Sequence, residues 1–201
     1  MSKKDAQALE KRLAFRRRLV WDELPPGEEK RVWELAEDYK VFLNASKTER
    51  ETIGEITRRI TAAGFVPCEY AAPGGKVFQV LKDKVLALAI LGKEPLSAGL
   101  QCIASHVDAP RLDLKQHPLY EETHLAFFKT HYYGGIKKYQ WLARPLALHG
   151  TILTAEKKKI HLAIGEKDQD PVFSVADLLP HLARKVQMEI KLSEAVEEER
   201  L

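Results

Sequence analysis

Apolar residues recur at helical spacing near the start of the chain, between residues 28 and 44. The apolar positions are Val32, Leu35, Ala36, Tyr39, Phe42 and Leu43. Glu28 and Glu29 fall in the first turn, where negative charge favours the helix dipole. The pattern therefore predicts an amphipathic helix over residues 28–44.

A second helix is predicted directly afterwards. Two overlapping capping boxes are available, Ser46 with Glu49 and Thr48 with Glu51, and Gly64 fits the position just past the helix end. Apolar side chains at helical spacing follow the boxes, namely Ile53, Ile56 and Ile60. The two helices thus precede any strand signal.

The period changes to that of strands from residue 76 onward. The runs KVFQVL and KVLALAILG flank a tight KDK segment and predict two strands. The next run, GLQCIASHVD, is apolar on both faces, so we expect a central strand covered by helices. This order of elements indicates an α/β fold.

The last third of the chain predicts a β-rich region and a further helix. PLALHGTIL, a lysine turn EKKK and IHLAIG together indicate a β-hairpin or meander. FSVADLLPHLARKV offers Ser174 or Asp177 as a helix start, with Pro180 in the first turn. The final EAVEEERL is expected to form a polar helical tail.

Composition and charge indicate a folded protein without a strong electrostatic partner. The 201 residues are 45% hydrophobic and 30% charged, which excludes a disordered chain. Lys and Arg number 32 against 29 Asp and Glu, a balance that does not favour nucleic acid as a partner. The basic KRLAFRRRLVW segment favours a solvated helix face, with RNA or a membrane surface as alternatives.

The sequence also predicts a compartment. MSKKDAQALEKRL lacks the apolar core of a secretory signal, and no run of about 18 apolar residues is present to span a membrane. Cys68 and Cys102 have no metal-type spacing and indicate free thiols in a reducing environment. We therefore expect a cytoplasmic protein with no membrane partner.

The chemistry of the chain is concentrated at the end of the third predicted strand. His106 and Asp108 lie roughly 6.6 Å apart on one side of an extended chain, immediately before Pro110. A carboxylate that holds one ring nitrogen of a histidine leaves the other nitrogen to bind a cation. The pattern is open to two interpretations, half of a metal site or a hydrogen-bonded strand terminus.

This stretch resembles the aspartyl aminopeptidase and vacuolar aminopeptidase I family of dinuclear zinc exopeptidases. The likeness extends over six segments in the order of the family: SKTERE, ILGKEPL, ASHVDAPRLDLK, THYYGGIKKYQW, PLALHG and DPVFSVADLLPHLA. It implies that residues 1–110 are the N-terminal part of the catalytic α/β domain. Residues 111–201 would then begin the β-rich dimerisation domain.

The resemblance also implies roles for three residues. His106 is similar to a zinc ligand, Asp108 to the acid that orients it, and His181 to a histidine that enters the active site of the neighbouring subunit. The implied function is a cytoplasmic, homo-oligomeric metalloaminopeptidase that uses two zinc ions to release N-terminal residues from a peptide substrate.

The other metal ligands of the family have no matching position in the chain. We therefore expect an inactive fragment of such an enzyme, and the alternative is a silent truncated product or a non-enzymatic assembly partner. Three glutamate groups could substitute as ligands but are better explained by a helix start, a loop and a solvated tail; they are Glu28 with Glu29, Glu121 with Glu122, and Glu197 to Glu199.

The remaining histidines and aromatic residues have structural explanations. His149 is expected to be a hydrogen-bonded core histidine and His161 a strand residue. Surface or loop positions are expected for His117, His124 and His131. Near Gly134 and Gly135, packing at the junction between the two domains is expected for Tyr132, Tyr133 and Trp141.

Overall fold

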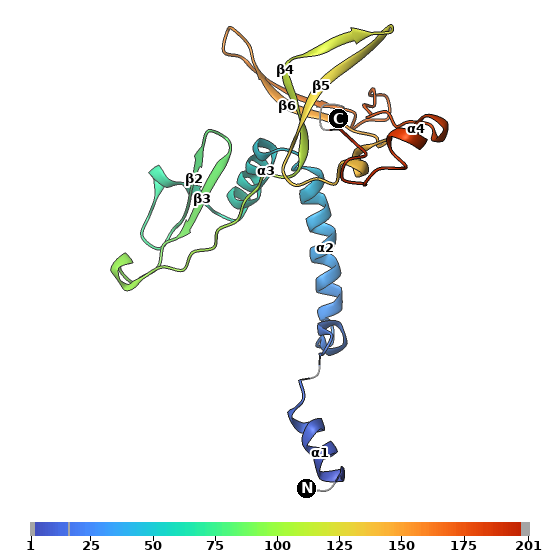
Figure 1. Cartoon of the computed structure of the whole chain (residues 1–201). Coiled ribbons are helices and arrows are strands. Elements are labelled where there is room, and N and C mark those ends of the chain that lie inside the picture. Colours follow the sequence, from blue (N-terminus) through green and yellow to red (C-terminus); the bar gives the residue numbers. More distant parts are fainter. Residues whose placement is uncertain (1–2, 16, 198–201) are drawn as a thin grey trace. The chain divides into compact units, whose positions relative to one another are not determined.

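The computed structural model describes residues 3–15 and 17–197 of the chain and shows a mixed α/β architecture (Figure 1). The chain divides into two units, residues 1–45 and residues 46–201. The expected domain boundary near residue 110 lies inside the second unit and stays a prediction.

The first unit consists of helices. It contains α1 (Lys3–Leu13), a short 3-10 helix (Val20–Glu23) and α2 (Glu28–Asn44), and the last of these confirms the predicted helix. α2 begins after Gly27, which has a φ of 88° and lets the chain turn into the helix. α1 ends at Leu13 and the 3-10 helix begins at Val20, so the described residues of the basic segment between them, 14, 15 and 17–19, are not helical.

The second unit opens with α3 (Glu49–Ala62), whose start follows one of the two predicted capping boxes. The Thr48 hydroxyl accepts a hydrogen bond from the Glu51 backbone N–H at 3.3 Å and donates to Glu51 Oε2 at 3.1 Å. Gly64 follows the helix end with a φ of 84°. Both predicted ends of this helix are therefore confirmed, and its predicted apolar residue Ile53 is buried.

The first sheet contains three strands in the order β1-β2-β3. β1 (Val66–Pro67) is parallel to β2 (Lys76–Leu81), which pairs antiparallel with β3 (Val85–Ile90). The turn between β2 and β3 places Lys82 and Asp83 at positive φ, as a tight hairpin turn requires. The two predicted strands are therefore confirmed.

The prediction of a central strand over GLQCIASHVD is wrong. Residues 101–110 form neither helix nor strand, and the Ile103 side chain is fully exposed. A strand with two apolar faces is stable only when neighbouring strands bond its backbone and helices cover its faces. Among the described residues no strand pairs with this segment, so it has neither kind of support.

A long hairpin follows that the sequence pattern did not predict. β4 (Arg111–Glu122) pairs antiparallel with β5 (Leu125–Tyr133), with a register shift between Leu114 and Leu119. The shift contains His117 at a φ of 51° followed by Pro118, which breaks the alternation that would have signalled a strand. The three histidines of this region are exposed, as expected. Glu121 and Glu122 end β4, so their expected loop position is wrong.

A second hairpin, formed by β6 (Leu148–Leu153) and β7 (Lys159–Ile164), confirms the prediction around the lysine turn. His161 lies in β7, as expected for a strand residue. Lys159 Nζ lies 2.6 Å from Asp83 Oδ2, which joins this hairpin to the β2–β3 turn.

The last helix, α4 (Pro180–Val186), begins later than predicted. The Asp177 carboxylate accepts hydrogen bonds from the Leu178 backbone N–H at 2.8 Å and from Gln187 Nε2 at 3.3 Å, so it does not cap the helix. Pro180 occupies the first turn, as predicted. Residues 194–197, the described part of the predicted tail, are not helical, so that expectation is wrong for them; residues 198–201 lie outside the described residues.

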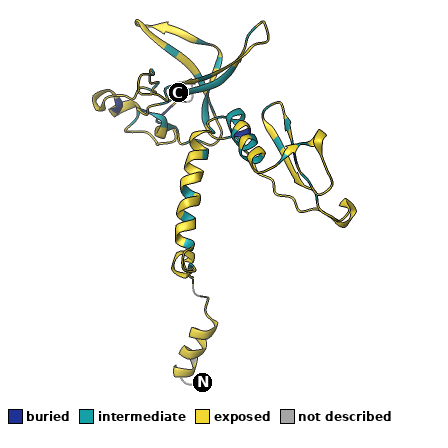
Figure 2. Ribbon diagram, turned by 180° about the vertical axis from the view of Figure 1, so that it is seen from behind, coloured by how far each residue is buried: buried dark blue, intermediate teal, exposed yellow. Residues whose placement is uncertain are grey.

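Few side chains are buried, and Figure 2 shows the dominance of exposed and half-buried positions. Among the described residues, the hydrophobic side chains in the buried class are those of Ile53, Val77, Ala183 and Val196. None of the helices in the described part of the chain has the length and apolar character needed to cross a membrane.

Candidate metal site

His106 and Asp108 come together in the extended segment that precedes β4. His106 Nδ1 lies 3.2 Å from Asp108 Oδ1 and 3.0 Å from the Asp108 backbone oxygen. Both acceptors belong to one residue and engage the same ring nitrogen, which leaves Nε2 for another ligand. The His106 side chain is 84% exposed, so the ring is accessible.

The Asp108 carboxylate is held on its other side by Tyr133 at the end of β5. The Tyr133 hydroxyl donates a hydrogen bond to Asp108 Oδ2 at 2.9 Å. This hydrogen bond, supported by one from the Asp108 backbone amide, lowers the pKa of Asp108 and outweighs the opposing effect of burial. The same hydrogen bond raises the pKa of Tyr133. Asp108 is therefore an ionised acceptor that faces both the Tyr133 hydroxyl and His106 Nδ1.

Arg111, the first residue of β4, connects this group to α3. Its Nη1 lies 2.8 Å from Glu49 Oε1, its Nε lies 2.7 Å from Asp113 Oδ1, and its guanidinium carbon lies 4.1 Å from the centre of the Tyr133 ring. The hydrogen bond to Asp113 is the largest cause that raises the pKa of Arg111, and Glu49 adds to it. The guanidinium thus joins a helix, a strand and an aromatic ring.

The sequence patterns did not reveal the roles of Arg111 and Glu49. They lie 62 positions apart, and their contact depends on how α3 packs near β4. The local signal was the spacing of Arg111 and Asp113, which share one face of a strand. The spacing of Arg111 and Asp113 has this meaning only in a strand, and the sequence pattern did not predict β4.

His149 in β6 forms a second polar cluster, which α3 also supports. Its Nδ1 lies 2.8 Å from Glu51 Oε1 and its Nε2 lies 2.8 Å from Glu166 Oε1. Burial alone would lower the pKa of His149, but the hydrogen bonds with Glu51 and Glu166 outweigh it and raise the pKa. With 12% of its side chain exposed, His149 is the hydrogen-bonded histidine that the sequence predicted.

His181 is not brought to this site by the described part of the chain. It lies on the exposed surface of α4, next to Pro180, and no hydrogen bond or ion pair joins it to His106 or Asp108 among residues 3–15 and 17–197. The role that the resemblance implies for it requires a neighbouring subunit, and it stays a prediction.

Zinc accepts imidazole nitrogen, thiolate sulfur and carboxylate oxygen, and structural or catalytic sites use at least three such protein ligands. His106 fits one of these positions, because Asp108 holds its Nδ1. Over the described ranges, no group of three or more His, Cys, Asp or Glu side chains is arranged to hold a metal ion. The residues present therefore fit one ligand and its orienting acid.

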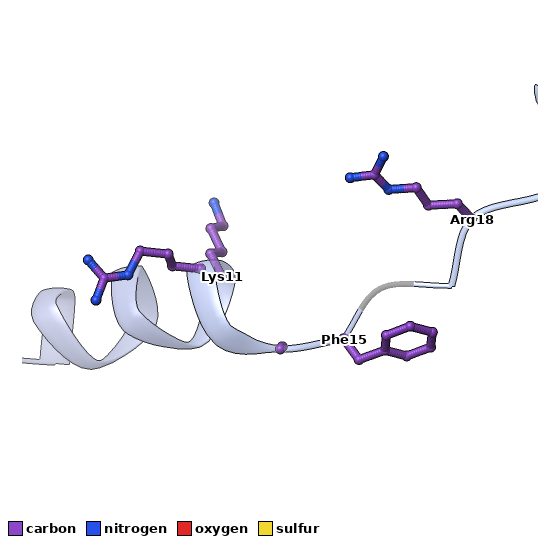
Figure 3. Close-up of a pocket in the computed structure, with 5 residues that line it drawn as sticks. Lys11, Phe15 and Arg18 are labelled. Carbon is purple, nitrogen blue, oxygen red and sulfur yellow. The ribbon is translucent and has the colours of Figure 1, made fainter. Parts of the chain in front are cut away.

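The hollow in Figure 3 lies in the first unit and does not supply further ligands. Its lining side chains are basic or apolar, namely Lys11, Arg12, Ala14, Phe15 and Arg18. Zinc ligands need a lone pair on nitrogen, oxygen or sulfur that these side chains do not offer at neutral pH. A second hollow lies at the tip of the β4–β5 hairpin around Tyr120 and His124. Neither hollow contains His106.

Comparison with known sequences defines the class of protein. Residues 42–201 match the family described as "Aminopeptidase I zinc metalloprotease (M18)". The match covers most of the chain and includes the whole of the second unit. The chain belongs to this family of zinc metalloproteases.

Individual relatives agree with that assignment. A probable M18 family aminopeptidase 1 from Borreliella burgdorferi is 42% identical over 184 residues, covering 90% of this chain and 40% of the relative. The corresponding protein from Clostridium acetobutylicum is 43% identical over 189 residues, with the same two shares. This chain therefore spans about two fifths of the length of these relatives.

Solved structures of the family share the fold. The M18 family aminopeptidase from Thermotoga maritima matches with a TM-score of 0.84 and 39% identity, over 93% of this chain and 41% of that chain. Aminopeptidase I from Clostridium acetobutylicum matches with a TM-score of 0.80 and 39% identity, over 94% and 42%. The α/β fold class expected from the sequence is confirmed.

Proposed function

We propose that this chain provides the N-terminal part of a zinc aminopeptidase that releases N-terminal residues from peptides. The observation that carries the proposal is the contact between His106 Nδ1 and Asp108 Oδ1, at 3.2 Å, in a chain that belongs to a zinc metalloprotease family. Asp108 keeps the hydrogen on Nδ1, so Nε2 carries the lone pair that binds the metal.

His106 would hold one of two zinc ions, the number that the family resemblance implies. Zinc supplies Lewis acidity to a peptide carbonyl and to an attacking water. The contribution of this chain is to present a neutral, oriented imidazole, which Asp108 achieves as an ionised acceptor with a lowered pKa. The remaining ligands have to come from outside the described residues, because these contain no group of three potential ligands.

A chimera tests this function. Residues 42–201 would replace the matching N-terminal region of the Thermotoga maritima relative, which has the same fold at 39% identity. We expect the chimera to bind zinc and to hydrolyse aminoacyl p-nitroanilides. His106→Ala should abolish hydrolysis and weaken zinc binding, whereas the control His131→Ala changes an exposed histidine of β5 and should leave both unchanged. A folded chimera that loses nothing on His106→Ala would contradict the proposal.

A second proposal concerns the isolated chain, which we expect to be catalytically silent and to act as an assembly partner. The observation in its favour is the absence of a three-ligand group in the described part of the chain. Purified chain supplied with Zn²⁺, Mn²⁺ or Co²⁺ should release no N-terminal residues. Turnover that disappears on His106→Ala would contradict the proposed lack of activity. It would show that one copy of the chain, or several copies together, provides a complete set of metal ligands.

His181 is proposed to act in the active site of the neighbouring subunit of a homo-oligomer. Its exposed position on α4 leaves it accessible to another subunit. In the chimera, His106→Ala and His181→Ala should each abolish activity. A mixed dimer of the two variants should regain roughly half of the wild-type activity, because one of its two sites then has both histidines. No recovery from a verified mixed dimer would place His181 outside the shared site.

The cytoplasm is the proposed compartment. Cys68 and Cys102 are both free and exposed, as is usual for thiols in a reducing environment. Fractionation of cells that express the tagged protein, with a cytoplasmic marker and an exported marker measured in parallel, tests this proposal. Recovery with the exported marker would overturn it.

A further inference from the structure

The two oxygens of the Asp108 carboxylate have different partners. Oδ1 lies 3.2 Å from His106 Nδ1, and Oδ2 accepts the hydrogen bond from the Tyr133 hydroxyl at 2.9 Å. A carboxylate with a single partner can rotate about its terminal bond, whereas one bonded at both oxygens is fixed in plane and direction. The direction of the imidazole therefore depends on a residue that does not touch it.

Strand pairing fixes the position of Tyr133. In the β4–β5 hairpin its backbone is paired with Arg111, so the register sets the distance between the ring and the start of β4. The segment that carries Asp108 enters β4 at this same point, through Ala109 and Pro110. Backbone geometry thus brings the hydroxyl and the carboxylate together.

Arg111 lies over the Tyr133 ring. Its guanidinium lies 4.1 Å from the ring centre, at a distance typical of a cation–π contact. Glu49 holds the guanidinium at 2.8 Å and Asp113 holds it at 2.7 Å, and about a third of the Arg111 side chain is exposed. A continuous series of contacts therefore leads from the first turn of α3 through Arg111 and Tyr133 to Asp108.

We propose that Tyr133 is a positioning residue for the metal-binding histidine: its hydroxyl fixes Asp108, and Asp108 fixes the orientation and tautomer of His106. Arg111 and Glu49 hold Tyr133 in place and make α3 part of the support. The inference rests on the proposed function, because that function makes His106 a zinc ligand. The effect of Tyr133 on the His106 tautomer can nevertheless be measured without metal.

The test is ¹⁵N NMR of the 201-residue chain with labelled histidine, at a pH where the imidazole is neutral. In the wild type we expect His106 to carry its hydrogen on Nδ1, because the Asp108 backbone oxygen and Asp108 Oδ1 both face that nitrogen. Tyr133→Phe keeps the ring under Arg111 and removes only the hydroxyl. It should shift the His106 population toward the tautomer with hydrogen on Nε2.

Tyr120→Phe is the matched control, because this tyrosine lies in β4 and its ring packs on Phe127 with centroids 5.3 Å apart. It should leave the His106 tautomer unchanged. An unchanged tautomer in Tyr133→Phe, with the fold verified by circular dichroism, would overturn the inference. An equal shift in Tyr120→Phe would also overturn it, since the effect would then be a general response to hydroxyl loss.

Zinc affinity of the chimera separates this inference from the proposed function. Loss of an outer partner of a ligating histidine typically weakens metal binding by about 10- to 100-fold, and Tyr133→Phe should fall in that range. A tautomer shift in a chimera whose His106 has no part in zinc binding would support the positioning by Tyr133 and contradict the proposed function. An unshifted tautomer in a chimera that binds zinc through His106 would contradict the positioning by Tyr133 and support the proposed function.

Discussion

At the scale of single residues, His149 is the side chain whose surroundings have the clearest consequence. Each of its ring nitrogens faces a carboxylate oxygen at 2.8 Å, from Glu51 in α3 and Glu166 after β7. Both nitrogens can donate only when the ring is protonated. The folded chain therefore favours the imidazolium, which agrees with the raised pKa of His149.

This arrangement predicts that stability decreases with pH in a defined range. A raised pKa means that the folded state binds the proton more tightly, so the contribution is complete below the ordinary histidine value of about 6.5. It is lost as the pH rises through the raised pKa of folded His149. Urea unfolding followed by circular dichroism should show the midpoint falling over that range in the wild type.

The control for this prediction is a second histidine of the same hairpin. His149→Gln should remove the fall, because the titrating group is gone. His161→Gln changes an exposed residue of β7, whose Nδ1 lies 3.3 Å from Thr151 Oγ1, and should retain the fall. A pH profile of His149→Gln that follows the wild type would rule out His149 as its source.

The sequence predicted the His106 and Asp108 contact because both residues lie in one short segment, where spacing alone sets their distance. The contacts of Asp108 with Tyr133 and of Arg111 with Glu49 join positions 25 and 62 residues apart. Such contacts depend on strand register and on the packing of α3, which no local pattern specifies. The contact between His106 and Asp108 was therefore predictable, and the contacts that support it were not.

At the scale of elements, the confirmed helices were predictable because their signals are local, and some strands were mispredicted because pairing is not local. α3 has its start signal in Thr48 and its stop signal in Gly64, both within the segment itself. Residues 99–108 have the composition of a buried strand, but a strand is stable only with neighbours that bond its backbone. β4 was missed for the opposite reason: it is paired, while Pro118 interrupts its pattern.

The start of α3 gives a prediction at this scale. Thr48→Ala removes the side-chain acceptor of the Glu51 backbone N–H and should lower the free energy of unfolding by about 1 kcal/mol. Urea unfolding measures the loss. Thr48→Ser keeps a capping oxygen and should retain most of the stability. Thr61→Ala is the helix-interior control, because its hydroxyl donates to the Thr57 carbonyl within the helix and caps no end, and it should cost much less.

For the whole molecule, the balance between buried and exposed apolar surface is the main physical feature. Within the second unit, Leu96 is 81% exposed, Leu100 73% and Ile103 fully exposed, and these residues lie close together in sequence. Soluble proteins rarely leave a contiguous apolar stretch in water, and such a stretch marks a site of association. The segment before His106 is therefore expected to be a site of association.

The final prediction follows from this exposed segment. The isolated chain should bind the dye 1-anilinonaphthalene-8-sulfonate and elute as an associated species, because Leu100 and Ile103 face solvent. Ile103→Asp should reduce both effects, whereas Lys115→Asp, a change of charge in β4, should not. In the chimera, strands from the relative should cover the segment and suppress dye binding without any mutation. Strong dye binding by a folded, active chimera would mean that the segment stays uncovered in the assembled enzyme, so its apolar residues would need an external partner.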